Sequence, residues 1–104
     1  MSADPGGRLD LMLLSVLEDG PAHGYRVIER LREQSGGAFD LPEGTVYPAL
    51  HRLERRGLLS SRWSDDAPRR RRIYEVTEAG NGALAQKRRD WRRFSGALEA
   101  VIGS

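Results

Sequence analysis

The sequence contains no cysteine. Disulfide bonds, thiolate metal sites and a cysteine nucleophile are therefore excluded for this chain. Long apolar runs are also absent, because the most apolar stretch, residues 11–17, is much shorter than the roughly 20 residues that span a membrane. No basic segment with a cleavage site precedes that stretch. We therefore expect a cytoplasmic protein with neither a membrane span nor an export signal.

Lysine is almost missing from a chain that is rich in arginine. Of 17 basic residues, all but Lys87 are arginine, and the formal net charge is +2. Residues 1–51 carry 4 arginines and 8 carboxylates, a net charge of −4, whereas residues 52–104 carry 13 basic and 7 acidic residues, a net charge of +6. The planar arginine fork suits phosphate and guanine, although the same bias also follows from a GC-rich genome. The capacity to bind phosphates is thus concentrated in the second half of the chain.

A helix is expected around residues 43–57, and the rest of the chain is organised about it. Its apolar residues recur at helical spacing and predict a stripe that faces a core: Val46, Ala49, Leu50 and Leu53. The other side carries Thr45, Tyr47, Pro48, His51, Arg52 and Arg55. Such a cationic, hydrogen-bonding face suits the major groove of DNA, and a merely solvated helix face is the alternative that this helix alone leaves open.

Two shorter helices are expected before this one, over about residues 8–18 and from residue 25 to Ser35. The first has Leu11 and Leu14 opposite its main apolar stripe, so we expect a second subunit to cover them. Two helices, a glycine-containing link and a third helix predict a helix-turn-helix. Because Pro48 lacks an amide hydrogen, the third helix begins either near Thr45 or near Glu43 with a bend.

The pattern becomes extended after the third helix. Residues 58–63 and 69–76 are β-rich and flank a turn-like segment, which predicts a hairpin. Its second strand opens with four arginines: Arg69, Arg70, Arg71 and Arg72. A hairpin with a cationic tip behind the third helix is a wing, expected to lie along the DNA backbone or to enter the minor groove.

A long helix is expected from Thr77 to the end of the chain, with Thr77 as its cap. A seam of coiled-coil type runs along it through Leu84, Trp91, Phe94, Leu98 and Val101, weakened at Lys87. Because so short a chain leaves little to cover this helix, we expect residues 1–76 to bind DNA and residues 77–104 to form a homodimer. The expected dimer interface comprises Leu11, Leu14, Leu84, Trp91, Phe94, Leu98 and Val101. In the alternative, Trp91 and Phe94 close the core of the monomer.

Three segments together resemble the PadR family of bacterial transcriptional regulators. They are residues 18–25 (EDGPAHGY), 44–58 (GTVYPALHRLERRGL) and 70–80 (RRRIYEVTEAG). The resemblance implies a winged helix-turn-helix that binds a palindromic double-stranded operator as a homodimer, usually as a repressor released by a small molecule. The positions that it implies near DNA are Tyr25, Thr45, Tyr47, Arg52 and Arg69 to Arg72.

The chain resembles the short type of the family, which has a single C-terminal helix. In some short members an aromatic residue of this helix lines a cavity for flat, hydrophobic and often cationic compounds, and Trp91 matches that position. Two features depart from the pattern: residues 65–68 read DDAP where glycine is usual, and Ile73 replaces the usual tyrosine.

Catalysis has little support in the sequence. His23 and His51 have no serine or cysteine nucleophile beside them, and there is no glycine-rich phosphate loop. His23 with Glu18 and Asp19 matches no metal-ligand spacing. We therefore expect a mainly α protein with a small β-hairpin that binds DNA, without enzymatic activity, cofactor or metal. The alternative is a winged-helix interaction module for RNA or for a protein partner.

Overall fold

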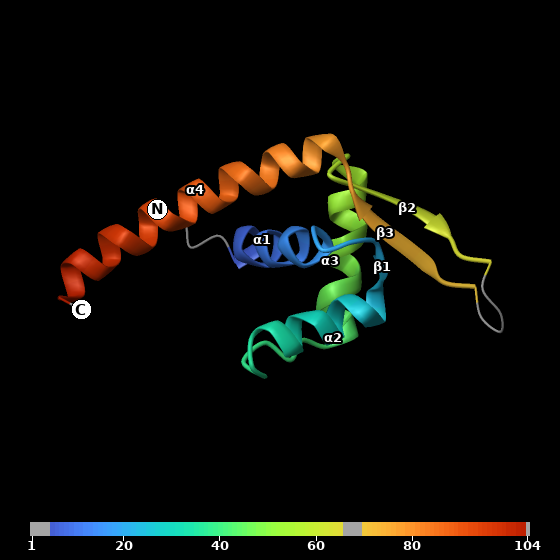
Figure 1. The fold of residues 1–104 in the computed structure, drawn as a ribbon, viewed down its shortest axis with the longest axis horizontal. Coiled ribbons are helices and arrows are strands. Elements are labelled where there is room, and N and C mark those ends of the chain that lie inside the picture. The colour runs from blue at the N-terminus through green and yellow to red at the C-terminus, as the bar shows by residue number, and fades with distance from the viewer. Residues whose placement is uncertain (1–4, 66–69, 104) are drawn as a thin grey trace.

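A computed structural model describes residues 5–65 and 70–103 (Figure 1). These residues form α1 (Pro5–Leu17), β1 (Ala22–His23), α2 (Gly24–Gln34), α3 (Glu43–Arg55), β2 (Leu59–Trp63), β3 (Arg72–Val76) and α4 (Glu78–Ile102). The prediction of a mainly α protein with a winged helix-turn-helix is confirmed. No helix of the described residues combines the length and apolar character needed to cross a membrane.

The sheet contains one strand that the sequence did not predict. Its order is β1-β3-β2, and all pairs are antiparallel. In the hairpin Ser61 lies opposite Tyr74, while β1 places His23 opposite Ile73. The expected second strand began at Arg69, which lies outside the described residues; the observed strand begins at Arg72. The consequence for the site is that β1 joins the start of α2 to the wing.

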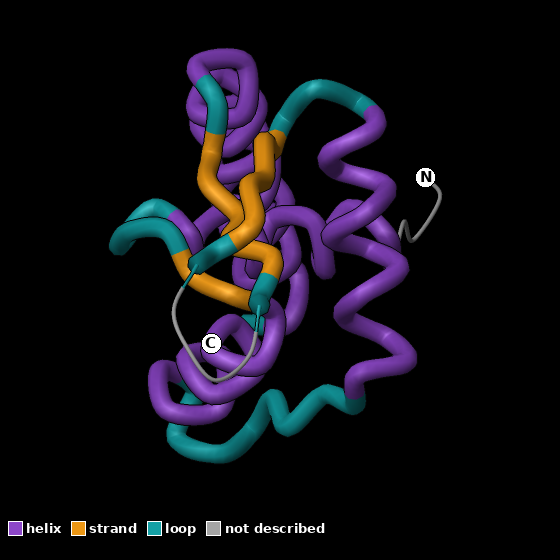
Figure 2. The backbone as a smooth tube through the Cα atoms, turned by 90° about the vertical axis from the view of Figure 1, so that its right-hand side faces the viewer, coloured by secondary structure: helices purple, strands orange, loops and turns teal. Residues whose placement is uncertain are grey.

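The core lies between the first three helices, the sheet and the first half of α4. All four predicted stripe residues of α3 are 0–1% exposed. They pack with buried residues of the other elements, among them Leu13, Leu17, Val27, Leu31, Leu59, Tyr74 and Leu84. Figure 2 looks along the wing and shows α3 beside the strands. In this view α3 runs from the loop that follows α2 to the turn that precedes β2.

The structure corrects the prediction for Leu14 and Leu84, which were expected between two subunits. Their side chains are 0% and 1% exposed in the single chain, so both belong to its own core. The reason is that the first half of α4 lies along α1 and covers its second apolar side. Arg88 of α4 fixes this contact by donating to Glu18 at 2.9 Å and to Ser15 at 3.0 Å.

Both ends of α3 are defined by the sequence around them. The helix begins at Glu43, so of the two expected starts the earlier one is observed, with Pro48 inside the helix. Gly57 adopts a positive φ of 77° just after the C-terminal end. There the Leu58 N–H donates to the Leu53 carbonyl at 3.0 Å, which satisfies a carbonyl that the helix leaves free.

α4 begins at the expected cap and then extends well past the rest of the chain. The Thr77 hydroxyl accepts from the Gly80 N–H at 3.0 Å. The molecule measures 53 × 29 × 22 Å, and its long dimension follows α4, whose C-terminal end projects beyond α1 in Figure 1. Within residues 5–65 and 70–103, the last turns of α4 therefore extend beyond the other elements, and Leu98, Val101 and Ile102 are exposed.

Candidate nucleic-acid interface

The polar side of α3 faces solvent. Thr45, Pro48, His51 and Arg55 are exposed, directly opposite the buried stripe of the same helix. Tyr25, near the start of α2, is also 55% exposed. These side chains supply hydroxyl, imidazole and guanidinium donors on one side of the helix-turn-helix, which is the chemistry that base edges and phosphates accept.

A hollow of about 570 Å³ separates this helix face from the wing. It is lined by His23, Gly24, Tyr25, Glu43, Tyr47, His51, Trp63, Arg70, Arg71, Arg72 and Tyr74. One wall is thus helical and mostly uncharged, whereas the other carries three arginines. The concave shape between a helix and a cationic hairpin suits a curved polyanion.

Tyr47 connects α3 to the first turn of α2. A Cβ atom on Gly24 would lie 2.1 Å from Cε1 of Tyr47, so the ring approaches this closely only because residue 24 is glycine. Burial, and then the nearby Glu43 and Tyr25, raise the pKa of the Tyr47 phenol. The hydroxyl therefore keeps its proton at neutral pH and remains a hydrogen-bond donor at the edge of the hollow.

The arginines of the wing are arranged around Trp63, which is 50% exposed. The guanidinium carbons of Arg70 and Arg72 lie 5.1 and 5.2 Å from the Trp63 ring centroid, within the range of cation–π contacts. Arg72 also donates to the Ser61 hydroxyl at 2.8 Å and pairs with Glu54. Arg72 is thus held by the protein itself, whereas Arg70 and Arg71 are exposed and precede the strand.

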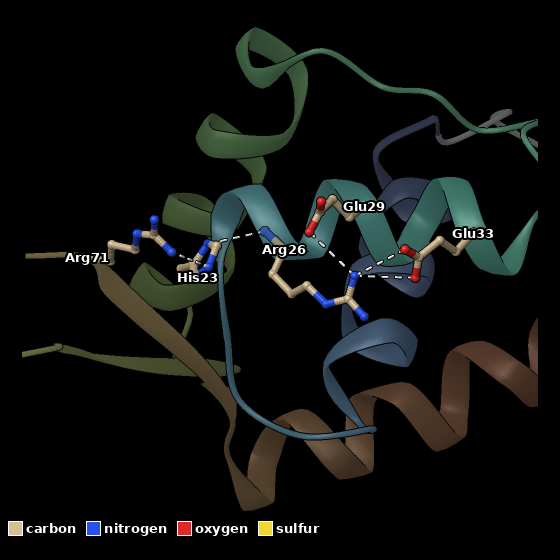
Figure 3. A network of polar contacts seen from close by, with 5 residues as sticks. All are labelled: His23, Arg26, Glu29, Glu33 and Arg71. Carbon is tan, nitrogen blue, oxygen red and sulfur yellow. Dashed lines mark hydrogen bonds and ion pairs between the residues drawn. The ribbon is translucent and has the colours of Figure 1, made fainter. Parts of the chain in front are cut away.

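His23 lies where the helix-turn-helix meets the wing (Figure 3). Its Nδ1 accepts from the backbone N–H of Arg26 at 3.2 Å and thereby caps α2. Its Nε2 lies 3.0 Å from a guanidinium nitrogen of Arg71. The ring of His23, at the end of β1, and a cation from the wing therefore meet just before the start of α2.

Comparison with known proteins assigns this arrangement to a family. Residues 13–86 match the Transcriptional regulator PadR-like family. The chain belongs to the PadR-like family. It is also 39% identical, over 79 residues that cover 76% of this chain and 71% of the relative, to the transcriptional regulator Rv3488 of Mycobacterium tuberculosis.

Solved structures agree with this assignment. A PadR family transcription regulator from Clostridium difficile is 31% identical, with a TM-score of 0.80 and coverage of 90% of this chain and 97% of that one. A transcriptional regulator from Clostridium thermocellum is 29% identical, also with a TM-score of 0.80, and coverage is 93% and 91%. This PadR-like chain is therefore a transcriptional regulator and not an enzyme. Among the described residues no group of three or more histidines and carboxylates is placed to hold a metal ion.

The structure places Arg52 differently from the prediction. We expected this PadR-like regulator to point Arg52 at DNA, but its guanidinium donates to Asp10 of α1 at 2.8 Å. Arg56 donates to the other Asp10 oxygen at 3.3 Å, and the Asp10 side chain is only 4% exposed. Arg52 therefore belongs to an ion pair between α1 and α3, and the proposed interface does not include it. Arg69, also predicted, lies outside the described residues.

The apolar residues expected at a dimer interface now fall into two groups. Trp91, Leu98 and Val101 are 44%, 45% and 83% exposed, whereas Leu14 and Leu84 are buried. Phe94 is partly buried and its ring centroid lies 5.9 Å from that of Trp91. The monomer core thus does not enclose Trp91, contrary to the alternative that we left open.

Leu11 lies elsewhere on the surface of the regulator. It lines a separate hollow of about 340 Å³, between α1, the end of α2 and the exposed Phe39. Leu11 is only partly buried in the single chain, so its place at a dimer interface stays a prediction.

Sequence reasoning missed three features: the Asp10 partner that holds Arg52, the place of Trp63 in the site, and the capping role of His23. Asp10 carried a signal, since a lone carboxylate among the apolar residues of the first helix requires a cationic partner. Trp63, on the hairpin between two arginine-rich segments, also marked a cation–π site. The role of His23 had no such signal, because a two-residue strand shows no periodicity from which its neighbours could be inferred.

Proposed function

We propose that this PadR-like chain is a homodimeric repressor that binds a palindromic double-stranded operator. The observation that carries the proposal is the hollow between α3 and the wing, which brings Tyr47 and His51 of α3 to the same surface as Arg70 and Arg71. Thr45 and Arg55 are exposed on the same helix. Helix side chains at base edges supply sequence preference, and the wing arginines supply affinity through phosphates.

Dimerisation is supported by the second half of α4. Three large apolar residues of this half are exposed: Leu98, Val101 and Ile102, at 45%, 83% and 66%. An apolar stripe of this kind on a projecting helix is stabilised when a second copy covers it. A two-fold dimer would present two α3 helices about 34 Å apart, the length of one duplex turn.

A competition experiment tests the DNA part of the proposal. A fluorescent palindromic duplex from the region upstream of the gene is bound to the protein and displaced by unlabelled palindrome, random duplex or hairpin RNA. We expect the palindrome to compete about a thousandfold better than random duplex at physiological salt. Equal competition by hairpin RNA would instead favour the alternative of an RNA-binding module, because both polymers carry phosphates.

We also propose that a planar aromatic or cationic compound binds near Trp91 and releases the operator. The exposed Trp91 ring already contacts Phe94, and the guanidinium carbon of Arg8 lies 5.9 Å from its centroid. Linkage requires that a releasing compound bind more weakly when operator is present. Quenching of Trp91 fluorescence in a Trp63→Phe variant measures that affinity. Equal affinity with and without saturating operator would show that this site does not control DNA binding.

A further inference from the structure

The His23 ring receives two donors but offers only one lone pair. The Arg26 N–H points at Nδ1, and the Arg71 guanidinium lies 3.0 Å from Nε2. A neutral imidazole carries one proton, so only one of its nitrogens accepts a hydrogen bond. One of the two contacts must therefore bring two N–H groups face to face.

The geometry determines which contact this is. The Arg26 N–H is fixed in the first turn of α2, where it has no partner within the helix and depends on the His23 cap. The Arg71 side chain is exposed and long, so it moves at little cost. Nδ1 therefore keeps its lone pair for the cap, Nε2 carries the proton, and Nε2–H faces the Arg71 guanidinium.

Among the residues that the structure describes, no carboxylate is paired with either group. Within residues 5–65 and 70–103, no carboxylate forms an ion pair with Arg71, whereas Arg26 is paired with Glu33 and Arg72 with Glu54. Figure 3 shows Glu29 and Glu33 of α2 turned toward Arg26, farther along the helix than the end where Arg71 lies. An anion that accepts from both Nε2–H and the guanidinium would satisfy the two facing donors at once.

We propose that His23 and Arg71 together bind one phosphate of the DNA backbone, at the point where the helix-turn-helix meets the wing. This inference rests on the proposed function and names a part of that interface. The start of α2 adds to the attraction, because a helix N-terminus carries a partial positive charge. One phosphate bound from both sides would fix the angle between the wing and α2 on the duplex.

The site also makes operator binding depend on pH. Burial, and then the Arg71 charge, lower the pKa of His23, with Arg26 and Arg30 adding to the effect and Glu29 opposing it. His23 is therefore neutral at pH 7 in the free protein. A bound phosphate opposes the arginine charges and raises that pKa, so binding takes up a proton at Nδ1. This proton displaces the Arg26 N–H from its cap, a loss that the attraction between the imidazolium and the phosphate offsets. Operator affinity should consequently increase as pH falls from about 8 to about 6.

Two substitutions separate the phosphate contact from the helix cap. His23→Asn keeps an acceptor oxygen near the Nδ1 position, as asparagine is a good cap, but removes the Nε2–H donor. Arg71→Gln removes the cation from an exposed position. Arg70→Gln is the matched control, because it removes the same charge from the neighbouring residue. We expect all three variants to fold with unchanged circular dichroism.

The measurement is a scan of the palindromic duplex, selected in the competition above, with one neutral methylphosphonate placed at each backbone position in turn. In the wild type, a methylphosphonate at the position bound by His23 and Arg71 should weaken binding about tenfold or more. A loss of this size is expected for hydrogen bonds to a charged group. That loss should disappear in His23→Asn and in Arg71→Gln, and persist in Arg70→Gln. The gain in affinity at low pH should be absent in His23→Asn.

Two results would overturn the inference. In the first, no methylphosphonate position loses its effect in both variants. In the second, His23→Asn keeps the wild-type pH dependence. If His23→Asn does not fold, the comparison of Arg71→Gln with Arg70→Gln tests the phosphate contact alone, because both residues are exposed and their replacement should not disturb the fold. The contact is then refuted if the effect of the methylphosphonate persists in Arg71→Gln. Failure of the wild type to prefer palindrome over random duplex is a different result, because it refutes the proposed function and this inference with it.

Discussion

Asp10 is a carboxylate inside the protein, held by two arginines from a distant part of the chain. Its side chain is 4% exposed, and its two oxygens accept from Arg52 at 2.8 Å and from Arg56 at 3.3 Å. A buried charge is costly unless it is paired, and removing one partner leaves much of that cost uncompensated. The pair fixes α1 against the C-terminal half of α3 and so sets the position of the exposed side of α3.

Replacing Arg52 should therefore affect folding more than specificity. We expect Arg52→Ala to lower the free energy of unfolding by roughly 1–2 kcal/mol, a reduced loss because Arg52 is half-exposed and Arg56 remains. Arg55→Ala removes the same charge from the exposed side of α3 and should change stability by less than about 0.5 kcal/mol. Urea unfolding of both variants measures the difference. Equal stabilities of the two variants would show that the Asp10 pair contributes nothing.

Helical periodicity predicted the buried side of α3 correctly but did not reveal that Arg52 pairs with Asp10. Val46 and Leu50 are fully buried as expected. Periodicity places a Cα atom on one side of a helix, however, and a long arginine at the edge of that side reaches a carboxylate that lies 42 positions earlier in the sequence. Such a partner cannot be inferred from local spacing.

At the scale of elements, the start of α4 is tied to the end of α3. The Thr77 hydroxyl donates to the Gly57 carbonyl at 2.7 Å while it accepts from the Gly80 N–H. A Cβ atom on Gly80 would lie 2.1 Å from the Leu58 carbonyl oxygen, so the helix and this turn are in direct backbone contact. Gly80 is thus required by the packing of α4.

Two glycines of the same helix should respond to alanine in opposite ways. Gly80→Ala must displace backbone, and we expect a loss of about 2 kcal/mol or more in the free energy of unfolding. Gly82→Ala meets no atom within 4 Å. It should therefore stabilise the helix by about 0.5–1 kcal/mol, the difference in helix propensity between the two residues. Thermal unfolding of the pair checks the account, and a neutral Gly80→Ala would refute the close contact.

The helices and the hairpin could be predicted because each carries its own periodic pattern and turn residues. β1 could not, because its two residues show no pattern and form a strand only by pairing with β3. The burial of Leu84 was also missed. The sequence marks the whole seam of α4 as apolar, but it does not tell which part packs against α1 of the same chain and which part projects.

At the scale of the whole molecule, the projecting end of α4 predicts how copies associate. Leu98 lies outside the monomer core and is 45% exposed, so Leu98→Asp should convert a dimer to a monomer that stays folded. Ala85→Asp places the same charge on a different side of α4 and should leave the dimer intact. Sedimentation at tens of micromolar distinguishes the two. A wild type that sediments as a monomer at that concentration would contradict the proposed dimer.

The central claim is that DNA lies between the exposed side of α3 and the wing, and the salt dependence of operator affinity tests it most directly. Two double variants each remove two positive charges: Arg70→Ala/Arg71→Ala on the wing and Arg92→Ala/Arg93→Ala on the exposed surface of α4. Losing two phosphate contacts should lower the slope of log K against log salt by roughly 2, about 0.9 per contact, for the wing variant. The slope of the α4 variant should stay at the wild-type value. Equal changes in both variants, or an unchanged slope in the wing variant, would contradict this account.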